Sequence, residues 1–485
     1  MDAGLLIDGH RATGTGPARR LTNPADGSFV AEVGDASADQ VSEAVASARA
    51  AMESWGETTP RERSEVLFRL AELIERRADE LVALEVAETG KPVTVARDGE
   101  LPFALDNLRF FAGAARSLAG TGAARLSPGY TSLLLRRPVG VVGAIAPWNF
   151  PTIMALWKAG PALAAGCTVV LKPSPQTPRT AARLAELGLE AGLPPGAWNV
   201  ITGGADVGMD LVAHPDVAMV TLTGSTETGR AVMAGAAPTL KRLHLELGGK
   251  APLLVFSDAD VERAASAAAL GGTYNSGQDC TAATRVYVER TRFDETVDAL
   301  HVALTSIQIG DPQDPSTDIG PLIGTDHRER VHGFVRRAAD ADARIVCGGR
   351  VPDGPGAYYP PTLVVGAGQR SEVVQSEVFG PVLVALPFDD EDEAVRLAND
   401  VEYGLASSIW TGDIGRAFRV MHRLEFGVTW INDHLPIASE APHGGLKGSG
   451  FGTDLSQQVI LEYSVGRHVM IRHDEPPERT GFRPA

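Results

Sequence analysis

The chain has 485 residues, of which 44% are hydrophobic and 22% charged, an ordinary balance for a globular protein of two or three domains. Its formal net charge of −17 opposes association with phosphate backbones and anionic bilayers, so we expect neither nucleic acid nor a membrane as partner. No secretory signal pattern and no apolar run of membrane-spanning length is visible, which predicts a cytoplasmic protein.

The three cysteines are few, odd in number and widely spaced. This pattern suits a reducing compartment and argues against a disulfide scaffold or a metal cluster, so we expect no metal. Cys167 and Cys347 lie beside β-type apolar runs and are predicted to be buried small hydrophobic residues. Cys280 lies instead among small and polar residues, in NSGQDCTA (275–282), and therefore needs another explanation.

Residues 59–90 predict a helix. Thr59 is a suitable cap, Pro60 suits the first helical position, and Glu62 completes a capping-box pattern. Leucine, isoleucine and valine then recur at helical spacing until Gly90.

From residue 139 onward, short apolar runs at 139–147, 167–173, 218–225 and 251–257 alternate with segments that suit helices. Strands without polar alternation predict a parallel sheet covered on both faces. Similar alternation beyond Cys280 predicts a second α/β unit. The segment 131–137 and the late run 466–473 predict exposed strands that need a partner, which we expect to be another subunit.

Three polar segments follow predicted strands: PWNFP (147–151), KPSPQTP (172–178) and TGSTETG (223–229). In open α/β sheets, ligands bind where strands end and helices begin, and a helix start can receive a phosphate. The usual GxGxxG nucleotide fingerprint is absent, so each segment taken singly is equally a plain strand-to-helix turn.

Two further residues could carry chemistry. Glu246, in LELGGK (245–250), is either a satisfied structural carboxylate or a general base whose pKa is raised by apolar walls. Cys280 could be a nucleophile if a nearby positive charge favours its thiolate. Such a nucleophile needs donors for an oxyanion, and the Asn149 side chain is a suitable amide.

The motifs PWNFP, KPS, TGSxxxG, ELGGK, GQxC and EVFGPV occur in this order and resemble the aldehyde dehydrogenase superfamily along almost the whole chain. The resemblance implies an α/β fold with a Rossmann-like cofactor domain, an α/β catalytic domain and a small β oligomerisation flap. The expected ranges are 1–118 and 139–247 with 444–464 for the cofactor domain, 248–443 for the catalytic domain, and 119–138 with 465–485 for the flap and tail. Homodimers or homotetramers are expected.

The resemblance also implies roles. Cys280 would attack the aldehyde carbon, Asn149 would hold the oxyanion, and Glu246 would activate the water that releases the acid. The cofactor-binding residues implied are Trp148, Lys172, Ser174, Gly224, Ser225, Glu377 and Phe379.

One departure from the family pattern concerns the cofactor. NAD-preferring relatives commonly carry Glu directly after KPS, whereas this chain has Pro175 followed by Gln176. Loss of that carboxylate permits NADP, although NAD remains the expected cofactor.

Within the superfamily, RFFAGAAR (109–116), NSGQDCTA and the C-terminal run resemble bacterial γ-aminobutyraldehyde dehydrogenases. This implies oxidation of 4-aminobutanal to 4-aminobutanoate, as in putrescine breakdown, in a pocket with carboxylates and aromatic walls. The candidate substrate-binding residues are Asp106, Trp157, Asp279 and His434.

Alternative interpretations stay open. Betaine aldehyde, another ω-aminoaldehyde or succinic semialdehyde could be the substrate. From a different class, the chain could be a non-catalytic binding protein with the same fold.

Overall fold

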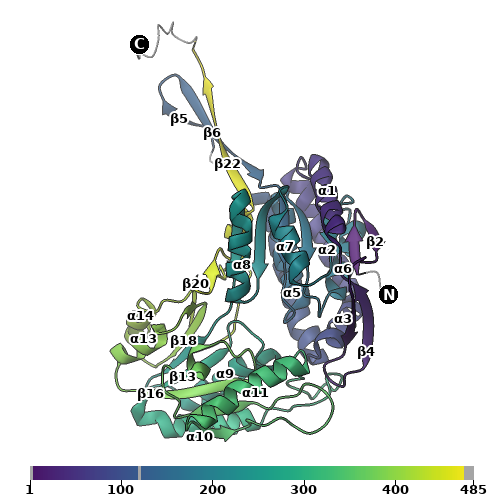
Figure 1. Cartoon of the computed structure of the whole chain (residues 1–485). Coiled ribbons are helices and arrows are strands. Elements are labelled where there is room, and N and C mark those ends of the chain that lie inside the picture. The colour runs from purple at the N-terminus through teal and green to yellow at the C-terminus, as the bar shows by residue number, and fades with distance from the viewer. Residues whose placement is uncertain (1–3, 118–121, 475–485) are drawn as a thin grey trace.

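The computed structural model describes residues 4–117 and 122–474. Figure 1 shows two lobes, each built on a β-sheet with helices on both faces, and an arm that projects from the upper lobe. The predicted α/β architecture is confirmed.

The first sheet has eight strands in the order β2-β1-β9-β8-β7-β10-β11-β21. Its five central strands, β9 to β11 in this order, run parallel. The bounds are β1 Leu5–Ile7, β2 His10–Ala12, β7 Val141–Ile145, β8 Thr168–Lys172, β9 Trp198–Val200, β10 Val217–Thr223, β11 Arg242–Glu246 and β21 Gly450–Phe451.

Two layers of helices cover this sheet because its central strands are apolar on both faces. Along β8, Val169 and Leu171 pack into one core, and Val170 packs into the other. One layer holds α2 Pro60–Arg76, α3 Ala78–Thr89, α4 Leu101–Ala114, α5 Pro151–Ala165, α6 Arg179–Ala191 and α15 Ser456–Glu462. The other holds α1 Ala38–Trp55, α7 Ala205–Ala213 and α8 Thr226–Ala236.

The second sheet has seven strands in the order β14-β15-β16-β13-β12-β18-β19. The bounds are β12 Ala251–Val255, β13 Ala283–Glu289, β14 Arg344–Cys347, β15 Thr362–Val365, β16 Val382–Phe388, β18 Ala406–Trp410 and β19 Val428–Ile431. Its helices are α9 Val261–Thr273, α10 Phe293–Thr305, α11 Thr325–Asp340, α12 Glu372–Gln375, α13 Glu391–Asn399 and α14 Ile414–Met421. The apolar run at 251–257, expected with the three runs before it, therefore belongs to this second sheet.

The arm is a three-stranded antiparallel sheet of β5 Ala124–Ser127, β6 Tyr130–Pro138 and β22 Ser464–Arg472 (Figure 1). Its strands β6 and β22 pair along their whole length, from Tyr130 opposite Arg472 to Pro138 opposite Ser464. The two predicted exposed strands are thus neighbours. Of the predicted flap and tail, 119–121 and 475–485 lie outside the described residues, and the domain boundaries remain predictions.

Two short strand pairs complete the described fold, β3 Ala18–Thr22 with β4 Phe29–Gly34, and β17 Tyr403–Gly404 with β20 Leu446–Lys447. A π-helical segment, Val95–Glu100, leads into α4, and 3-10 turns occur at Ala115–Ser117, Ala237–Thr239, Tyr274–Gly277 and Arg290–Arg292.

The predicted helix at 59–90 begins and ends as expected, but a single continuous helix is wrong. Thr59 and Glu62 form the reciprocal capping box, and Gly90 ends the segment with φ 72°. The chain leaves helical geometry at Arg77, where φ is −106° and ψ is 20°. Both helices pack on α6, but α2 also packs on α4 and α5, whereas α3 packs on the π-helical segment and β3.

Within the two described ranges, none of the helices is both long and apolar enough to cross a membrane.

Candidate active site

The carboxyl ends of four neighbouring parallel strands bring together residues that the sequence separates widely. Strands β8, β7, β10 and β11 lie side by side in that order and point the same way. The residues at or just beyond their ends are Lys172, Trp148 with Asn149, Gly224 with Ser225, and Glu246. These are most of the predicted catalytic and cofactor-binding residues.

A strained loop carries Cys280. Asn275, Ser276 and Gly277 follow α9 with φ values of 50°, 57° and 71°, three successive residues in the left-handed region. A Cβ on Gly277 would lie 2.3 Å from the carbonyl carbon of Gly380, so only glycine fits there. Left-handed non-glycine residues cost roughly 1–3 kcal/mol each and cluster at functional sites.

Asn149 is held against this loop by hydrogen bonds from both sides. Its side-chain Nδ2 donates to the Gln278 carbonyl at 3.0 Å, and Asn275 Nδ2 donates to the Asn149 carbonyl at 2.8 Å. The Lys91 ammonium also donates to that carbonyl, at 3.0 Å. The PWNFP turn is therefore tied to the loop two residues before Cys280.

Glu377 and Glu246 reach the same place from other segments. The Gly249 N–H donates to Glu377 Oε1 at 2.9 Å. A Cβ on Gly249 would lie 2.0 Å from the Cys280 carbonyl oxygen, so the ELGGK segment touches the loop that carries Cys280 directly. Within the described ranges, Glu246 Oε1 is buried without a hydrogen-bond partner.

Burial and like charge shape the titration of these groups. Burial, reinforced by the carboxylates of Asp279, Glu377 and Glu246, raises the pKa of the Cys280 thiol well above its usual range. Burial also raises the pKa of Glu377 to about 7, against the Gly249 hydrogen bond. The pKa of Glu246 is raised by burial and by the nearby Asp454. The protein alone therefore keeps the thiol protonated at neutral pH.

A cavity of about 400 Å³ opens onto Cys280. Three of the four predicted substrate-binding residues, Trp157, Asp279 and His434, line it. Its walls are otherwise mainly aromatic and aliphatic, and they also carry Glu100, Phe103, Phe150, Met154, Tyr274, Asp433, Ile437 and His443. Most of these residues come from helices and loops that show no motif, so nothing in the sequence singles them out.

Asp106, the fourth predicted residue, is not on the cavity wall. It is exposed on α4, and the Ser439 hydroxyl donates to its carboxylate. The neighbouring Asn107 points inward instead and accepts from Trp157 Nε1 at 2.7 Å. The two side chains meet at Ser439, whose hydroxyl accepts from Asn107 Nδ2 at 2.7 Å and donates to Asp106, but of the two only Asn107 is buried.

The other predicted side chains of this cavity have structural partners as well. Asp279 Oδ1 accepts from the backbone N–H and the hydroxyl of Thr281, at 2.8 and 2.9 Å. His434 Nε2 lies 2.9 Å from the Thr281 carbonyl, and burial lowers the pKa of this imidazole. The neutral ring braces the loop after Cys280.

On the cofactor side, Lys172 Nζ donates to the Pro173 and Gly203 carbonyls at 3.1 and 2.9 Å. Burial lowers the pKa of Lys172 to about 8. Ser225 caps α8 by accepting from the Thr228 N–H at 3.1 Å, which leaves the first turn of that helix facing the strand ends. Ser174 is buried, and its hydroxyl accepts from the Gln176 N–H at 3.3 Å.

Two aromatic residues stand where these segments meet the second lobe. The Trp148 and Phe379 rings make an edge contact with centroids 5.3 Å apart, and His327 packs on Trp148. Phe379 adopts a left-handed backbone with φ 59°. His327 was not predicted, because it lies in the first turn of α11, in a segment with no motif.

The aldehyde dehydrogenase family model matches residues 12–469. The chain belongs to the aldehyde dehydrogenase family. A betaine aldehyde dehydrogenase of Vibrio vulnificus (strain YJ016) is 39% identical to this enzyme over 94% of its chain and 95% of the relative's.

Solved structures support the same family assignment. A Staphylococcus aureus betaine aldehyde dehydrogenase in complex with NAD+ is 35% identical, with a TM-score of 0.95 over 99% of this chain and 97% of that one. A Bacillus cereus aldehyde dehydrogenase is 37% identical, with a TM-score of 0.95 over 98% and 97%. This protein is therefore an aldehyde-oxidising dehydrogenase with the predicted fold.

Proposed function

We propose that this dehydrogenase uses NAD+ to oxidise a short aldehyde that carries a cationic nitrogen, 4-aminobutanal to 4-aminobutanoate in the first place. The observation that carries the proposal is the cavity at Cys280, where aromatic walls stand beside acidic side chains. An ammonium group is attracted both by carboxylates and by the faces of aromatic rings. The net charge of −17 favours the same sign of substrate.

Cys280 acts as the nucleophile in this proposal. Its thiol releases a proton to water, the sulfur bonds to the aldehyde carbon, and the C=O π bond breaks so that the carbonyl oxygen of the substrate becomes an oxyanion. One N–H of the Asn149 amide is bonded to the Gln278 carbonyl. In this proposal the second N–H donates to the oxyanion together with the Cys280 backbone N–H. Loss of hydride from the same carbon gives a thioester on Cys280.

Glu246 acts as the base for release. It takes a proton from water, the hydroxide attacks the thioester, and the acid leaves as the Cys280 thiolate forms. A raised pKa makes the Glu246 carboxylate a stronger base than an exposed glutamate.

The residues fit NAD+ at the strand ends. Lys172, Ser225 at the start of α8 and Glu377 surround the edge of the sheet where dinucleotides bind in doubly wound folds. When bound, NAD+ supplies the hydride acceptor and a positive charge that opposes the carboxylates around Cys280. The S. aureus relative was solved with NAD+, which supports this assignment.

Betaine aldehyde is the second candidate substrate, favoured by the names of the V. vulnificus and S. aureus relatives. Its quaternary nitrogen suits aromatic walls as well as a primary ammonium does, but it cannot donate a hydrogen bond to a carboxylate. The two candidates thus differ in how much they depend on the cavity acids Asp279 and Asp433.

A panel of aldehydes tests the proposal, with 4-aminobutanal, betaine aldehyde, propanal and succinic semialdehyde compared by kcat/KM from reduced-cofactor absorbance. We expect both cations to exceed propanal, and propanal to exceed the anionic semialdehyde. Equal or faster turnover of succinic semialdehyde would refute a cationic pocket.

Two cysteine variants provide the control. Cys280→Ala should abolish the absorbance rise, whereas Cys347→Ala, which removes a half-buried thiol on β14, should retain it. A rise that survives in Cys280→Ala contradicts the proposed nucleophile, and no activity in any form of the enzyme favours a non-catalytic binding protein.

We also propose that the arm of β5, β6 and β22 joins subunits into a homodimer or homotetramer. The arm exposes the apolar side chains of Leu135, Met470 and Ile471. Exposed apolar strands favour association with another chain. Sedimentation of the wild type against Leu135→Glu tests this, and an unchanged oligomer contradicts it.

A further inference from the structure

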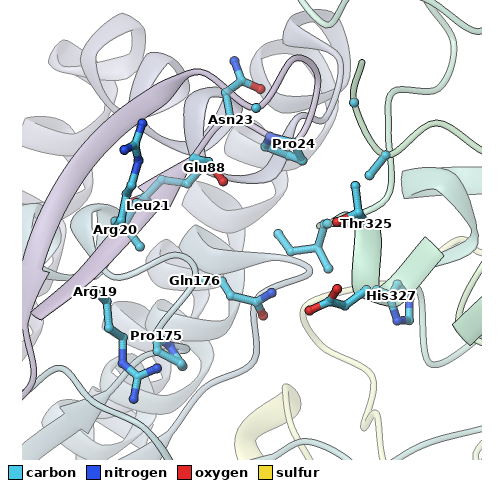
Figure 2. A pocket seen from close by; sticks show the side chains of 17 residues that line it. Arg19, Arg20, Leu21, Asn23, Pro24, Glu88, Pro175, Gln176, Thr325 and His327 are labelled. Carbon is cyan, nitrogen blue, oxygen red and sulfur yellow. The ribbon is translucent and has the colours of Figure 1, made fainter. Parts of the chain in front are cut away.

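Arg19 lies beside Pro175, the residue that stands where NAD-preferring relatives commonly carry glutamate after KPS. It lines a cavity of about 590 Å³ together with Pro175 and Gln176, the residues that follow KPS (Figure 2). Proline offers neither charge nor a side-chain hydrogen bond at this position. Figure 2 shows the Arg19 side chain, which comes from β3, beside Pro175.

The Arg19 guanidinium is fixed from behind by Asp35. Nε donates to both carboxylate oxygens of Asp35, at 2.7 and 2.9 Å, and Nη2 donates to Oδ2 at 2.7 Å. The Asp35 side chain is 7% exposed and that of Arg19 is 43% exposed, so the acid is on the protein side and the cation faces the cavity. Among the described residues, Nη1 of Arg19 has no hydrogen-bond acceptor.

Arg19 also shares a backbone segment with Lys172. Lys172 Nζ donates to the Gly203 carbonyl at 2.9 Å, and a Cβ on the adjacent Gly204 would lie 2.8 Å from Arg19 Nη2. Besides burial, the charges of Asp35 and Arg19 act on the pKa of Lys172, the former raising it and the latter lowering it. The two cations therefore face the same small region at the end of β8.

Dinucleotide sites of doubly wound sheets distinguish NAD from NADP at the adenosine ribose. A carboxylate accepts from the ribose 2′-hydroxyl and repels a phosphate, whereas an arginine binds a 2′-phosphate. We propose that Arg19 receives the 2′-phosphate of NADP+, so that this enzyme uses NADP+ as well as NAD+. The proposal rests on the proposed cofactor site at Lys172.

The donor chemistry of Arg19 supports this assignment. Arg20 and Lys172 add positive charge near it and the carboxylates of Asp35, Glu88 and Asp326 add negative charge, so the guanidinium itself, not the net charge, selects the phosphate. A guanidinium has five N–H donors in a rigid fork and can bridge a carboxylate and a phosphate at once, which an ammonium cannot do with the same geometry. Asp35 then positions Arg19 and need not touch the cofactor.

Steady-state kinetics with both cofactors test the proposal. The wild type should reduce NADP+ readily, and Arg19→Leu should lose about 10- to 100-fold in kcat/KM for NADP+ with less than about threefold change for NAD+, the loss expected for hydrogen bonds to a charged group. Absence of NADP+ turnover by the wild type, or an equal loss with both cofactors, would overturn the proposal.

Arg20→Leu is the matched control. Arg20 is the next residue of β3, lines the same cavity and lies over the Phe29 ring at 5.3 Å. Successive strand residues point to opposite faces, so this variant removes the same charge without removing the fork at Arg19. A loss for NADP+ as large as that of Arg19→Leu would assign the effect to general charge and overturn the role of Arg19.

Nucleotide binding gives a readout without catalysis. By calorimetry, the wild type should bind adenosine 2′,5′-bisphosphate at least about tenfold more tightly than 5′-AMP, and Arg19→Leu should bind the two alike. Equal affinities in the wild type would overturn the inference whether or not the variant folds. Failure of the proposed function differs, because neither nucleotide would then bind and neither cofactor would be reduced.

Discussion

Two buried lysines act on residues near Cys280, Lys91 on Asn149 and Lys158 on Glu246, and their surroundings differ. The Lys91 cluster consists of Lys91 with Glu85 at 3.0 Å and Glu100 in direct contact. The Lys158 cluster consists of Lys158 with Asp454 at 3.0 Å, and His244 between Asp454 and Glu462 at 3.3 and 3.1 Å. Each buried acid of these two clusters has a cation beside it; these acids are Glu85, Glu100 and Asp454.

The difference lies in what each cluster holds. Lys91 donates to the Asn149 carbonyl, so its cluster fixes the position of the predicted oxyanion donor. The Lys158 cluster lies close enough to Glu246 for Lys158 and Asp454 to act on the pKa of that carboxylate, yet Glu246 has no ion-pair partner within the described residues. Buried charge thus fixes a position in one region and tunes a proton affinity in the other.

The largest expected effect comes from removing the base. Glu246→Gln should lower kcat by about 10²- to 10⁴-fold while the free energy of unfolding hardly changes, because an amide is isosteric and needs no counter-charge. Stopped-flow absorbance should still show one equivalent of reduced cofactor per active site, since thioester formation precedes the step that uses this base.

Glu43→Gln, an exposed position on α1, serves as the control and should keep wild-type turnover. If the first turnover of Glu246→Gln slows as much as steady-state turnover does, this carboxylate acts before thioester hydrolysis.

Removing Lys91 should mainly affect stability. Lys91→Met leaves the buried Glu85 carboxylate without its cation and Glu100 without its contact, which is expected to cost about 3–5 kcal/mol in the free energy of unfolding. Denaturant titration measures this. Lys447→Met breaks the more exposed pair with Glu425 and should cost about 1 kcal/mol or less. Similar losses of unfolding free energy in the two variants would show that the Lys91 cluster stabilises the fold no more than an exposed ion pair does.

The free energy of unfolding should depend on pH in opposite directions for the Lys91 cluster and the Lys158 cluster. Burial, reinforced by Glu85, raises the pKa of Glu100 to about 8, despite attraction by Lys91. The folded protein then holds a proton that the unfolded chain releases, so this contribution is full below the ordinary carboxyl pKa and is lost as pH rises through 8. We expect a smaller loss of unfolding free energy between pH 5 and pH 9 in Glu100→Gln than in the wild type. If the free energy of unfolding depends on pH identically in the wild type and in Glu100→Gln, the prediction is wrong.

Asp454 should respond in the opposite sense. Although burial opposes ionisation, Lys158 and His244 hold the pKa of Asp454 well below its ordinary value. Its contribution to stability is therefore present above the ordinary carboxyl pKa and is lost as pH falls through the lowered one.

The smallest predicted effect is a shift in a pH–rate profile. Asp454→Asn removes a negative charge that raises the pKa of Glu246 and leaves Lys158, which lowers it. The acidic limb of kcat, which reports deprotonation of this base, should move to lower pH. A limb that stays in place, with thermal stability retained, would mean that another group limits the rate.

Short motifs were enough to locate the candidate site residues in the chain. The cap at Thr59 and the end of β8 at Lys172 follow from residues adjacent in the chain, whereas the turn with Asn149 and the loop with Cys280 are held by contacts with distant segments. Strand ends meet at one edge of a parallel sheet, so their convergence was also predictable.

Tertiary structure alone decided the cavity walls and the partners of buried charges. Asp106 and Asn107 are sequence neighbours, yet only packing against Trp157 and Ser439 turns the amide inward and leaves the acid outside. Lys158 and Asp454 are 296 residues apart, and Arg19 meets the turn at Pro175 from another strand pair. Such contacts depend on how the lobes and helices pack, and no pattern of neighbouring residues predicts which distant residues will meet.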